Sequence, residues 1–493
     1  MFFVLRILVV SFFFWILFPS WERIYFYHFG EVTNSDALYP FLFAGDFWTA
    51  PSYVTGWSFP PSHYFFPDVL FFILGYPLSS EVFTLYSFYA GFCFVFVYYF
   101  FRQMKIPNYA SLAGSVFLLK LGEISPVSWG QFYLPGFHSA EIFLVLCFFI
   151  LFKRKDKARF SFVFPFILLT SVSLLSESWF AVHSGLPLLI LFLADKNGQK
   201  SKTILFVIVS IILYKVAVFY LGHLGFRSYS PNEFPIKKLL LETWASFKIN
   251  PSSYLSSVFI ENAKLPVSKF LFPAYWIFVL FFLFSWKKFQ KQIQDKETYH
   301  STLLYLYLIL SPFCGLLFLS LTGIEFNARY LFILPISCFG LFCYFLKKRR
   351  ILLRVFLSTF LAFTLVGSNR FAPDPKLEEQ ILSGKTKQSH RIECTVQTWR
   401  KWGKPIGAAD YWPVKYLKVM SKESIHLIPL TESGEYYPWI HNRNWDKGIA
   451  DLGDTNSFDW AITEGEKKEI WNRKGVEFES CENWQLIRFD LSQ

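Results

Sequence analysis

Long apolar runs alternate with short polar segments through the first three quarters of the chain. The runs are roughly 16–20 residues long, which is close to the length that a helix needs to cross a bilayer. They predict a polytopic α-helical membrane protein with about eleven transmembrane helices. We place these helices at residues 2–18, 82–101, 108–122, 137–152, 160–176, 179–194, 203–221, 270–286, 302–321, 329–346 and 351–367.

The polar segments give these spans an orientation. With the N-terminus in the cytoplasm, every dense cluster of Lys and Arg falls in a loop on the cytoplasmic side, as the positive-inside rule requires. The clusters lie at 102–105, 153–159, 196–202, 287–296 and 347–350. An odd number of spans then puts the C-terminus outside. No small-residue cleavage site follows the first span, so we interpret it as an uncleaved signal anchor.

Hydropathy falls sharply after the last span and divides the chain into two parts. Residues 1–368 form the transmembrane module, and residues 369–493 are expected to form a small extracytoplasmic α/β domain. The sequences IHLIPL, FDWAITE and WQLIRFD predict strands at 425–430, 458–464 and 484–490. We expect helices at 410–420 and 467–473.

The first outside loop, residues 19–81, is unusually rich in aromatic residues and proline. Amphipathic rings of this kind lie at the headgroup level of a bilayer. Residues 66–78 are apolar but too short to cross, and they predict a helix along the outer membrane face. The loop also contains Asp36, Asp46, Asp68 and His63. Ionisable groups at this depth are costly, so the loop is a candidate functional site.

Composition supports the membrane assignment and narrows the chemistry. The chain is 53% hydrophobic, 22% aromatic and only 17% charged, with a net charge of +12. Because the basic residues cluster at span ends, they are a topology signal rather than a nucleic-acid surface. No His/Cys metal set, nucleotide-binding glycine loop or Ser-His-Asp order is visible.

The seven cysteines are divided between the transmembrane module and the C-terminal region. Five lie in apolar spans and are expected to be small packing residues. Cys394 and Cys481 are the two cysteines of the polar C-terminal region. An oxidising exterior permits a disulfide between them, and the sequence leaves open whether it forms.

Further ionisable residues collect at the outer ends of the spans. Lys120, Glu141, Lys215 and Arg329 all approach the face that carries the first loop. Ordinary interfacial snorkelling is one explanation. Cations at this leaflet, beside carboxylates in an aromatic loop, also suit the handling of a lipid-linked phosphate.

Three segments resemble the GT-C class of integral-membrane glycosyltransferases, which includes protein mannosyltransferases and aminoarabinose transferases. The first is NSDALYP, with an acidic residue early in the first outside loop. The second is FPPSHYFFPDVLFFILG, which leads into a span ending in YYFFRQMK. The third is ARYLFILPISCFGLF, in a late span. Mannosyltransferases have a second acid directly after the first, whereas Ala37 follows Asp36 here.

The resemblance implies an inverting transfer of a sugar from a polyprenyl-phosphate donor to a lipid or glycan acceptor on the extracytoplasmic face. Asp36 is the expected general base, and Asp46 is the second candidate. Arg329, Lys120, Lys215, His63 and Glu141 are expected to contact substrate or lipid phosphate. No metal ligand is assigned, although a divalent cation is compatible with the class. The expected location is the inner membrane, and no nucleic-acid partner is expected.

Each of these roles has a structural alternative. Asp36 and Asp46 can be turn or cap residues, His63 an interfacial histidine, and Arg329 a span-end anchor. At the level of the whole protein, the alternatives are a transporter or flippase of lipid-linked saccharides and a non-catalytic scaffold of the same fold. Spans broken by Gly or Pro at matching places in two halves would favour a transporter, and none is visible.

Overall fold

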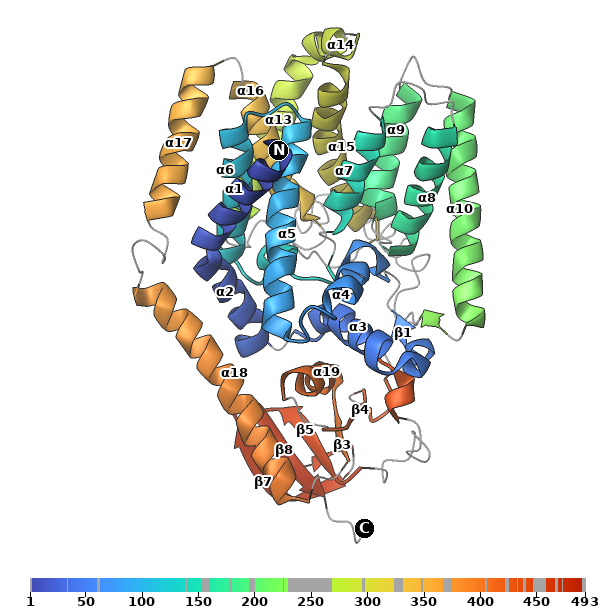
Figure 1. Ribbon diagram of the computed structural model, residues 1–493, viewed down its shortest axis with the longest axis vertical. Helices are drawn as coiled ribbons and strands as arrows, with labels where there is room; N and C mark the ends of the chain where they lie inside the picture. Colours follow the sequence, from blue (N-terminus) through green and yellow to red (C-terminus); the bar gives the residue numbers. More distant parts are fainter. Residues whose placement is uncertain are drawn as a thin grey trace, which may run out of the picture.

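The computed structural model describes most of the chain. The described residues are 2–32, 34–59, 63–137, 140–152, 160–176, 180–194, 200–224, 226–228, 268–294, 298–322, 331–346, 349–366, 375–403, 406–421, 425–431, 433–437, 440–446, 458–465, 469–471 and 473–489. Figure 1 shows a helical bundle, a small sheet domain at one end of it, and the helices of the first outside loop between the two.

A helix lies at each of the eleven apolar segments predicted from the sequence. These helices are α1 Phe2–Ile16, α5 Val82–Gln103, α6 Asn108–Ile124, α7 Ala140–Phe152, α8 Phe160–Ser176, α9 Leu186–Ala194, α10 Lys200–His223, α13 Ser268–Phe284, α15 Tyr299–Thr322, α16 Ile333–Leu346 and α17 Arg350–Val366. A further helix, α14 Trp286–Gln294, lies at the end of the bundle away from the sheet domain (Figure 1).

The fold is mostly helical, but few of the described helices are long enough to count as membrane spans by length and composition. Within the described residues, Val82–Gln103 and Ser301–Leu319 are long and apolar enough to cross a membrane. The pair Phe3–Ile16 and Phe18–Glu31, bent by 58°, makes a third if it counts as one span. Shorter apolar helices account for seven of the remaining segments, and another, Phe65–Gly75, lies in the first outside loop. The eleven-span topology therefore stays a prediction.

The first outside loop is largely helical, which its aromatic composition did not reveal. Its elements are α2 Phe18–Phe26, η1 Tyr27–Glu31, η2 Asp36–Leu38, α3 Tyr39–Thr49, η3 Pro51–Gly56, η4 Phe65–Val69 and α4 Leu70–Gly75. Pro19 and Pro40 lie in the first turns of α2 and α3, where a missing N–H costs no helical hydrogen bond. The helix predicted at 66–78 is present as the contiguous η4 and α4, which end at Gly75, and Phe66 near its start has extended φ/ψ values of −130° and 127°. Its position on the outer membrane face stays a prediction.

The C-terminal domain is built on a six-stranded mixed sheet. Its strands are β3 Gly407–Ala409, β4 Leu427–Pro429, β5 Trp460–Glu464, β6 Glu469–Ile470, β7 Arg473–Cys481 and β8 Trp484–Phe489. The order is β4-β3-β5-β8-β7-β6, with β3 parallel to β4 and β5 and the other pairs antiparallel. Two helices pack against the sheet: α18 Pro375–Lys401 contacts β7, and α19 Tyr411–Met420 contacts β3 and β4. The three predicted strands and the helix at 410–420 are confirmed.

The predicted helix at 467–473 is wrong. Its residues contribute β6 and the start of β7, which pair as a hairpin through Glu469 with Lys474 and Ile470 with Arg473. The charged sequence has no strand-like alternation, but β7 continues along β8 from Gly475 to Cys481. This pairing with a strand later in the chain overrides the local helical preference.

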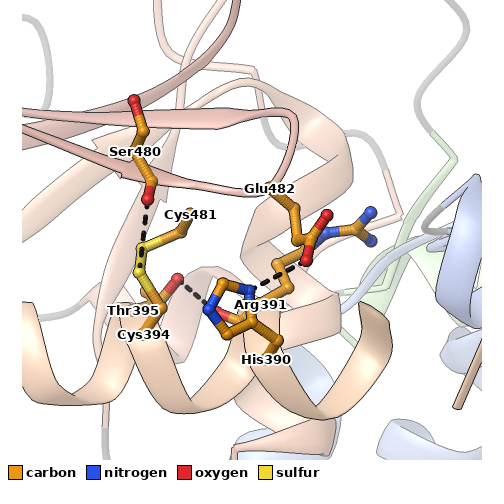
Figure 2. The surroundings of a disulfide bond; sticks show 7 residues. All are labelled: His390, Arg391, Cys394, Thr395, Ser480, Cys481 and Glu482. Carbon is orange, nitrogen blue, oxygen red and sulfur yellow. Dashed lines mark hydrogen bonds and ion pairs between the residues drawn. A yellow bond between two sulfur atoms is a disulfide. The ribbon is translucent and has the colours of Figure 1, made fainter. Parts of the chain in front are cut away.

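A disulfide between Cys394 and Cys481 joins α18 to the end of β7 (Figure 2). The two Cα atoms are 5.6 Å apart. Beside the disulfide, His390 Nδ1 lies 2.8 Å from the Glu482 carboxylate. The long helix α18 is therefore tied to the sheet on one side while its other face packs on the first outside loop. At that face Gly30 meets Gly384, where a side chain on Gly30 would lie 2.3 Å from the Gly384 carbonyl oxygen.

Candidate functional site

The first outside loop is clamped between the bundle and the C-terminal domain through direct hydrogen bonds. The hydroxyl of Tyr416 on α19 donates to the Phe29 carbonyl at 2.8 Å. The Ser58 amide donates to the His441 carbonyl at 2.8 Å. The carboxylates Asp36 and Asp46 both lie in this junction, on η2 and α3.

Asp36 is half-buried and faces the N-terminal turn of α19. The Tyr411 hydroxyl donates to its Oδ1 atom, and the neighbouring Ser35 hydroxyl donates to the Trp412 carbonyl. The start of α19 is fixed by Asp410, whose carboxylate accepts a 3.2 Å hydrogen bond from the Trp412 amide. A helix N-cap of this kind positions Tyr411 rigidly against the first loop.

Lys415 lies one helical turn after Tyr411 and is 1% exposed. Its ammonium donates to the Ile440 carbonyl at 3.1 Å and lies 3.6 Å from the centroid of the Tyr411 ring. Burial lowers the pKa of Lys415 well below its usual value, and the charge of Asp36 opposes this shift. Burial and the charge of Asp36 together raise the pKa of Tyr411, so its hydroxyl stays protonated as a donor. A carboxylate, a phenol and a buried amine therefore meet at one place.

Asp46 is held by three rigid donors instead of one. Its Oδ2 atom accepts hydrogen bonds from the Trp57 indole at 2.9 Å and the Asn442 amide at 2.6 Å. The indole of Trp445 lies 3.2 and 3.1 Å from its two oxygens. Burial raises the pKa of Asp46, and these three hydrogen bonds, led by Asn442, oppose the increase. Asp46 thus joins α3 to the η10 turn, Arg443–Asp446, of the domain.

His63 and Asp68 hold the same loop to the bundle. The Nδ1 atom of His63 lies 3.1 Å from the Leu175 carbonyl at the end of α8, and its ring stacks on Phe65. Asp68 is fully buried and accepts hydrogen bonds from Tyr89 at 2.6 Å and the Gly136 amide at 2.8 Å. These contacts fix the loop on its bundle side.

Among the described residues, the predicted Lys120 and Lys215 do not converge on one place. Lys120 pairs with Glu123 at 2.7 Å near the end of α6. Lys215 is exposed on α10, 5.5 Å from the Tyr214 ring. Figure 1 shows α6 and α10 on opposite sides of the bundle, so these two lysines do not act at one place. Arg329 and the Pro-Pro pair of the second motif lie outside the described residues.

Glu141 belongs to a buried polar group inside the bundle. It accepts a hydrogen bond from the Ser184 hydroxyl, and its carboxylate lies 3.5 Å from His183. The Tyr307 hydroxyl is 2.8 Å from the Ser184 hydroxyl. All four side chains are fully buried. Glu141 therefore holds α7 to α15 and to the short helix η6, Ala181–Gly185, which accounts for its conformation without a ligand.

Whether the protein has a metal site can be judged only for the part of the chain that the structure describes. No group of three or more His, Cys, Asp or Glu side chains there has an arrangement that can hold a metal ion. Asp36 has Ala37 beside it and Tyr411 as its hydrogen-bond donor. These neighbours do not fit a divalent cation, so no chemical step is assigned to one.

Comparison with known proteins adds no family to this picture. No protein-family model matches the chain, and no curated protein matches its sequence. The geometry of the junction is therefore the observation from which a function can be inferred.

Sequence reasoning missed Tyr411 and Lys415, which are the described side chains that interact with Asp36. Their spacing of four residues on a predicted helix, directly after Asp410, was visible in the sequence. What was missing was the docking of that helix on a loop 375 residues earlier in the chain.

Proposed function

We propose that the chain is a multi-pass membrane glycosyltransferase of GT-C-like architecture. It transfers a sugar from a polyprenyl-phosphate donor to a lipid or glycan acceptor, with inversion, at the extracytoplasmic end of the bundle. Its N-terminus is cytoplasmic and its C-terminal domain extracytoplasmic. The observation that carries the proposal is the meeting of Asp36 with Tyr411 and Lys415 at the junction of bundle and domain.

The arrangement of charge supports this orientation. The basic sequence WKKFQKQIQ of α14 lies at the end of the bundle opposite the C-terminal domain (Figure 1). Arg102, at the end of α5 away from the domain, belongs to another of the basic clusters. A cytoplasmic location for that end satisfies the positive-inside rule and puts the first outside loop where a lipid carrier in the outer leaflet can reach it.

The proposed reaction is a single displacement with Asp36 as general base. The acceptor hydroxyl gives its proton to the Asp36 carboxylate as its oxygen bonds to the anomeric carbon. The bond from that carbon to the phosphate oxygen breaks, and its electron pair leaves with the lipid phosphate. Tyr411 occupies Oδ1, so Oδ2 is the oxygen that takes the proton. General-base catalysis contributes about 10²–10⁴-fold to the rate.

The other side chains at the junction act on Asp36 rather than on the sugar. The Tyr411 hydroxyl fixes the carboxylate, and the buried Lys415 amine packs against the Tyr411 ring from within the domain. Neither Lys120 nor Lys215 is assigned to the leaving phosphate, because they lie on opposite sides of the bundle. Arg329 stays the predicted phosphate ligand.

The test is the glycolipid and surface-glycan profile of cells that lack the gene. We expect one lipid-linked sugar to accumulate and one glycan product to disappear, and re-expression of the wild type to reverse both changes. Asp36→Ala should fail to reverse them although the protein is present in the membrane. A transporter would instead leave the saccharide on the cytoplasmic leaflet, and a scaffold would be indifferent to Asp36→Ala.

The chain offers a matched control for this experiment. Glu31 lies in the same loop and makes an exposed ion pair with Lys387 at 2.8 Å. Exposed pairs contribute little to stability, so Glu31→Gln should behave as the wild type. An unchanged profile in the cells lacking the gene would remove the basis of the proposal.

A further inference from the structure

A large crevice lies beside the junction contacts and is lined by both the first outside loop and the C-terminal domain. Its volume is about 1500 Å³, which exceeds the roughly 300–1,000 Å³ of pockets for drug-sized ligands. Its walls come from α2, α3 and the start of α5 on one side, and from α18, the end of α19 and the two residues before β4 on the other. Asp46 lines it, whereas Asp36 and Tyr411 are absent from the described lining.

The polar groups of the crevice are fixed before any ligand arrives. The three donors on Asp46 hold its carboxylate in one orientation, and two of them bind only through Oδ2. Lys418 lies 4.2 Å from the centroid of the Trp445 ring. Burial lowers the pKa of Lys418, while the charges of Asp46 and Asp446 oppose this. The crevice thus presents a fixed acceptor and a fixed donor close together.

His426 adds a further polar group to the crevice, and Asp446 lies behind it. Its Nε2 atom lies 3.1 Å from Asp446 Oδ1, and Asp446 is 1% exposed. The other Asp446 oxygen accepts hydrogen bonds from His441 at 2.8 Å and Tyr436 at 2.7 Å. The Asp446 carboxylate therefore lies against the Nε2 edge of the ring, and Nδ1 is the ring nitrogen that this contact leaves for a ligand.

The charge balance of the crevice disfavours an anionic ligand. Four carboxylates line it against the two lysines Lys385 and Lys418, and they are Glu22, Asp46, Glu81 and Glu378. Glu81 caps α5 through the Thr84 amide at 2.6 Å, and Asp46 has its three donors, so these carboxylates are already engaged. This engagement also weakens the attraction for a cationic ligand.

The rest of the lining is aromatic and aliphatic. Phe41, Tyr76 and Phe83 come from the first loop and α5, and Leu382 and Ile392 come from α18. Fixed donors and acceptors next to such surfaces match a ligand with hydroxyl groups, which both donate and accept, and with apolar ring faces.

We propose that this crevice is a binding site for a neutral saccharide of more than one sugar unit, separate from the site at Asp36. Asp46, Lys418 and His426 provide its polar contacts. The proposal goes beyond the transfer reaction, because binding here requires no catalysis. The saccharide is either free or carried on a lipid.

The test uses the purified full-length protein in nanodiscs. Binding of neutral hexose and N-acetylhexosamine oligosaccharides is measured by titration calorimetry, beside inorganic phosphate and a trilysine peptide. We expect an oligosaccharide to bind and phosphate and trilysine not to bind. Comparison with the same oligosaccharide on a polyprenyl phosphate identifies the source, because a lipid-borne ligand binds at least tenfold more tightly than the free sugar.

Two variants locate the binding in the crevice. Leu382 is exposed at its wall, so Leu382→Trp should fill it and weaken binding at least tenfold with the fold unchanged. His426→Ala should weaken binding in the same way. Thr386, exposed on the same helix but absent from the described lining, gives the matched control Thr386→Trp.

Asp36→Asn separates this proposal from the proposed function, since it should bind the oligosaccharide as the wild type does while losing transfer. The absence of binding by every oligosaccharide would overturn the inference. So would binding that Leu382→Trp does not weaken, or a preference for phosphate or trilysine.

Discussion

Asp36 and Asp46 belong to the same outside loop and both contact the C-terminal domain, yet their surroundings differ. Asp36 has a tyrosine hydroxyl on one oxygen and a buried amine nearby. Asp46 is held by two indoles and an amide on rigid elements. A carboxylate with one exchangeable partner is able to accept a proton from a substrate. A carboxylate with three fixed donors is suited to holding two parts of a protein together.

The two carboxylates also face different helices of the C-terminal domain. Asp36 interacts with α19, which is held by the sheet and by its own N-cap. The crevice beside Asp46 is walled by α18, which the disulfide fixes to β7. Changes to α18 should therefore affect the Asp46 side and spare the Asp36 side.

Loss of the disulfide should have the largest effect. Replacing Cys394 and Cys481 together with Ser should lower the free energy of unfolding of the domain by about 2–4 kcal/mol. Saccharide binding in the crevice should weaken, while transfer per folded molecule stays near that of the wild type. Thermal unfolding under non-reducing conditions measures the first effect. Cys147→Ser, which removes a free cysteine in the bundle, is the control.

Asp46→Ala should have the second largest effect on stability, because it removes the partner of two buried donors, Trp57 and Asn442, and of the half-buried Trp445. Leaving buried donors unpaired costs about 1–3 kcal/mol. Asp36→Ala removes the partner of a single hydroxyl at a half-buried site and should cost less. Limited proteolysis of the two variants in nanodiscs makes the comparison. Equal sensitivity would show that the two carboxylates contribute alike to docking.

Tyr411→Phe should lower transfer activity, whereas a matched change on the crevice side should not. Loss of one hydrogen bond to a charged group, about 1.5–3 kcal/mol, should lower kcat by at least about tenfold and leave the donor KM nearly unchanged. Tyr436→Phe removes a hydroxyl from Asp446 on the crevice side and should not change kcat. A fall of the same size in both variants would mean that the domain acts as one unit.

The smallest effect expected is a pH dependence confined to the crevice side. Burial lowers the pKa of His441 below its usual 6.5, with Lys415 and Lys418 adding to the shift and Asp446 opposing it. As the pH falls below about 6.5, the unfolded chain binds a proton that the folded domain does not, so stability falls by at most about 1.4 kcal/mol per pH unit.

Asp446 does not contribute in this range. Burial alone would raise its pKa, but the charge of His441 and the hydrogen bonds from His426, His441 and Tyr436 together hold it well below its usual value. Its stabilising effect is present above about pH 3.9 and is lost only as the pH falls through its lower folded-state pKa. Melting temperatures at pH 7.5 and 5.5 should therefore differ less in His441→Gln than in the wild type, and an unchanged difference would exclude His441 as the cause.

The bundle was predictable because its signal is local. Continuous apolar runs put helices at the right places, and the strands at 425–430, 458–464 and 484–490 followed from their own residues. The junction was not predictable, because Asp36 meets Tyr411 and Asp46 meets Asn442 across nearly 400 residues. The long helix α18 was missed since its sequence is mostly polar and gives no apolar run.

The most direct test is transfer by purified protein in nanodiscs, supplied with radiolabelled polyprenyl-phosphate sugars extracted from cells that lack the gene. The wild type should move the label from the lipid phosphate to an acceptor. Asp36→Asn should bind the donor with similar affinity and transfer at least about 100-fold more slowly. Transfer by Asp36→Asn at the rate of the wild type, or no transfer by the wild type with any of these donors, would contradict the role proposed for Asp36.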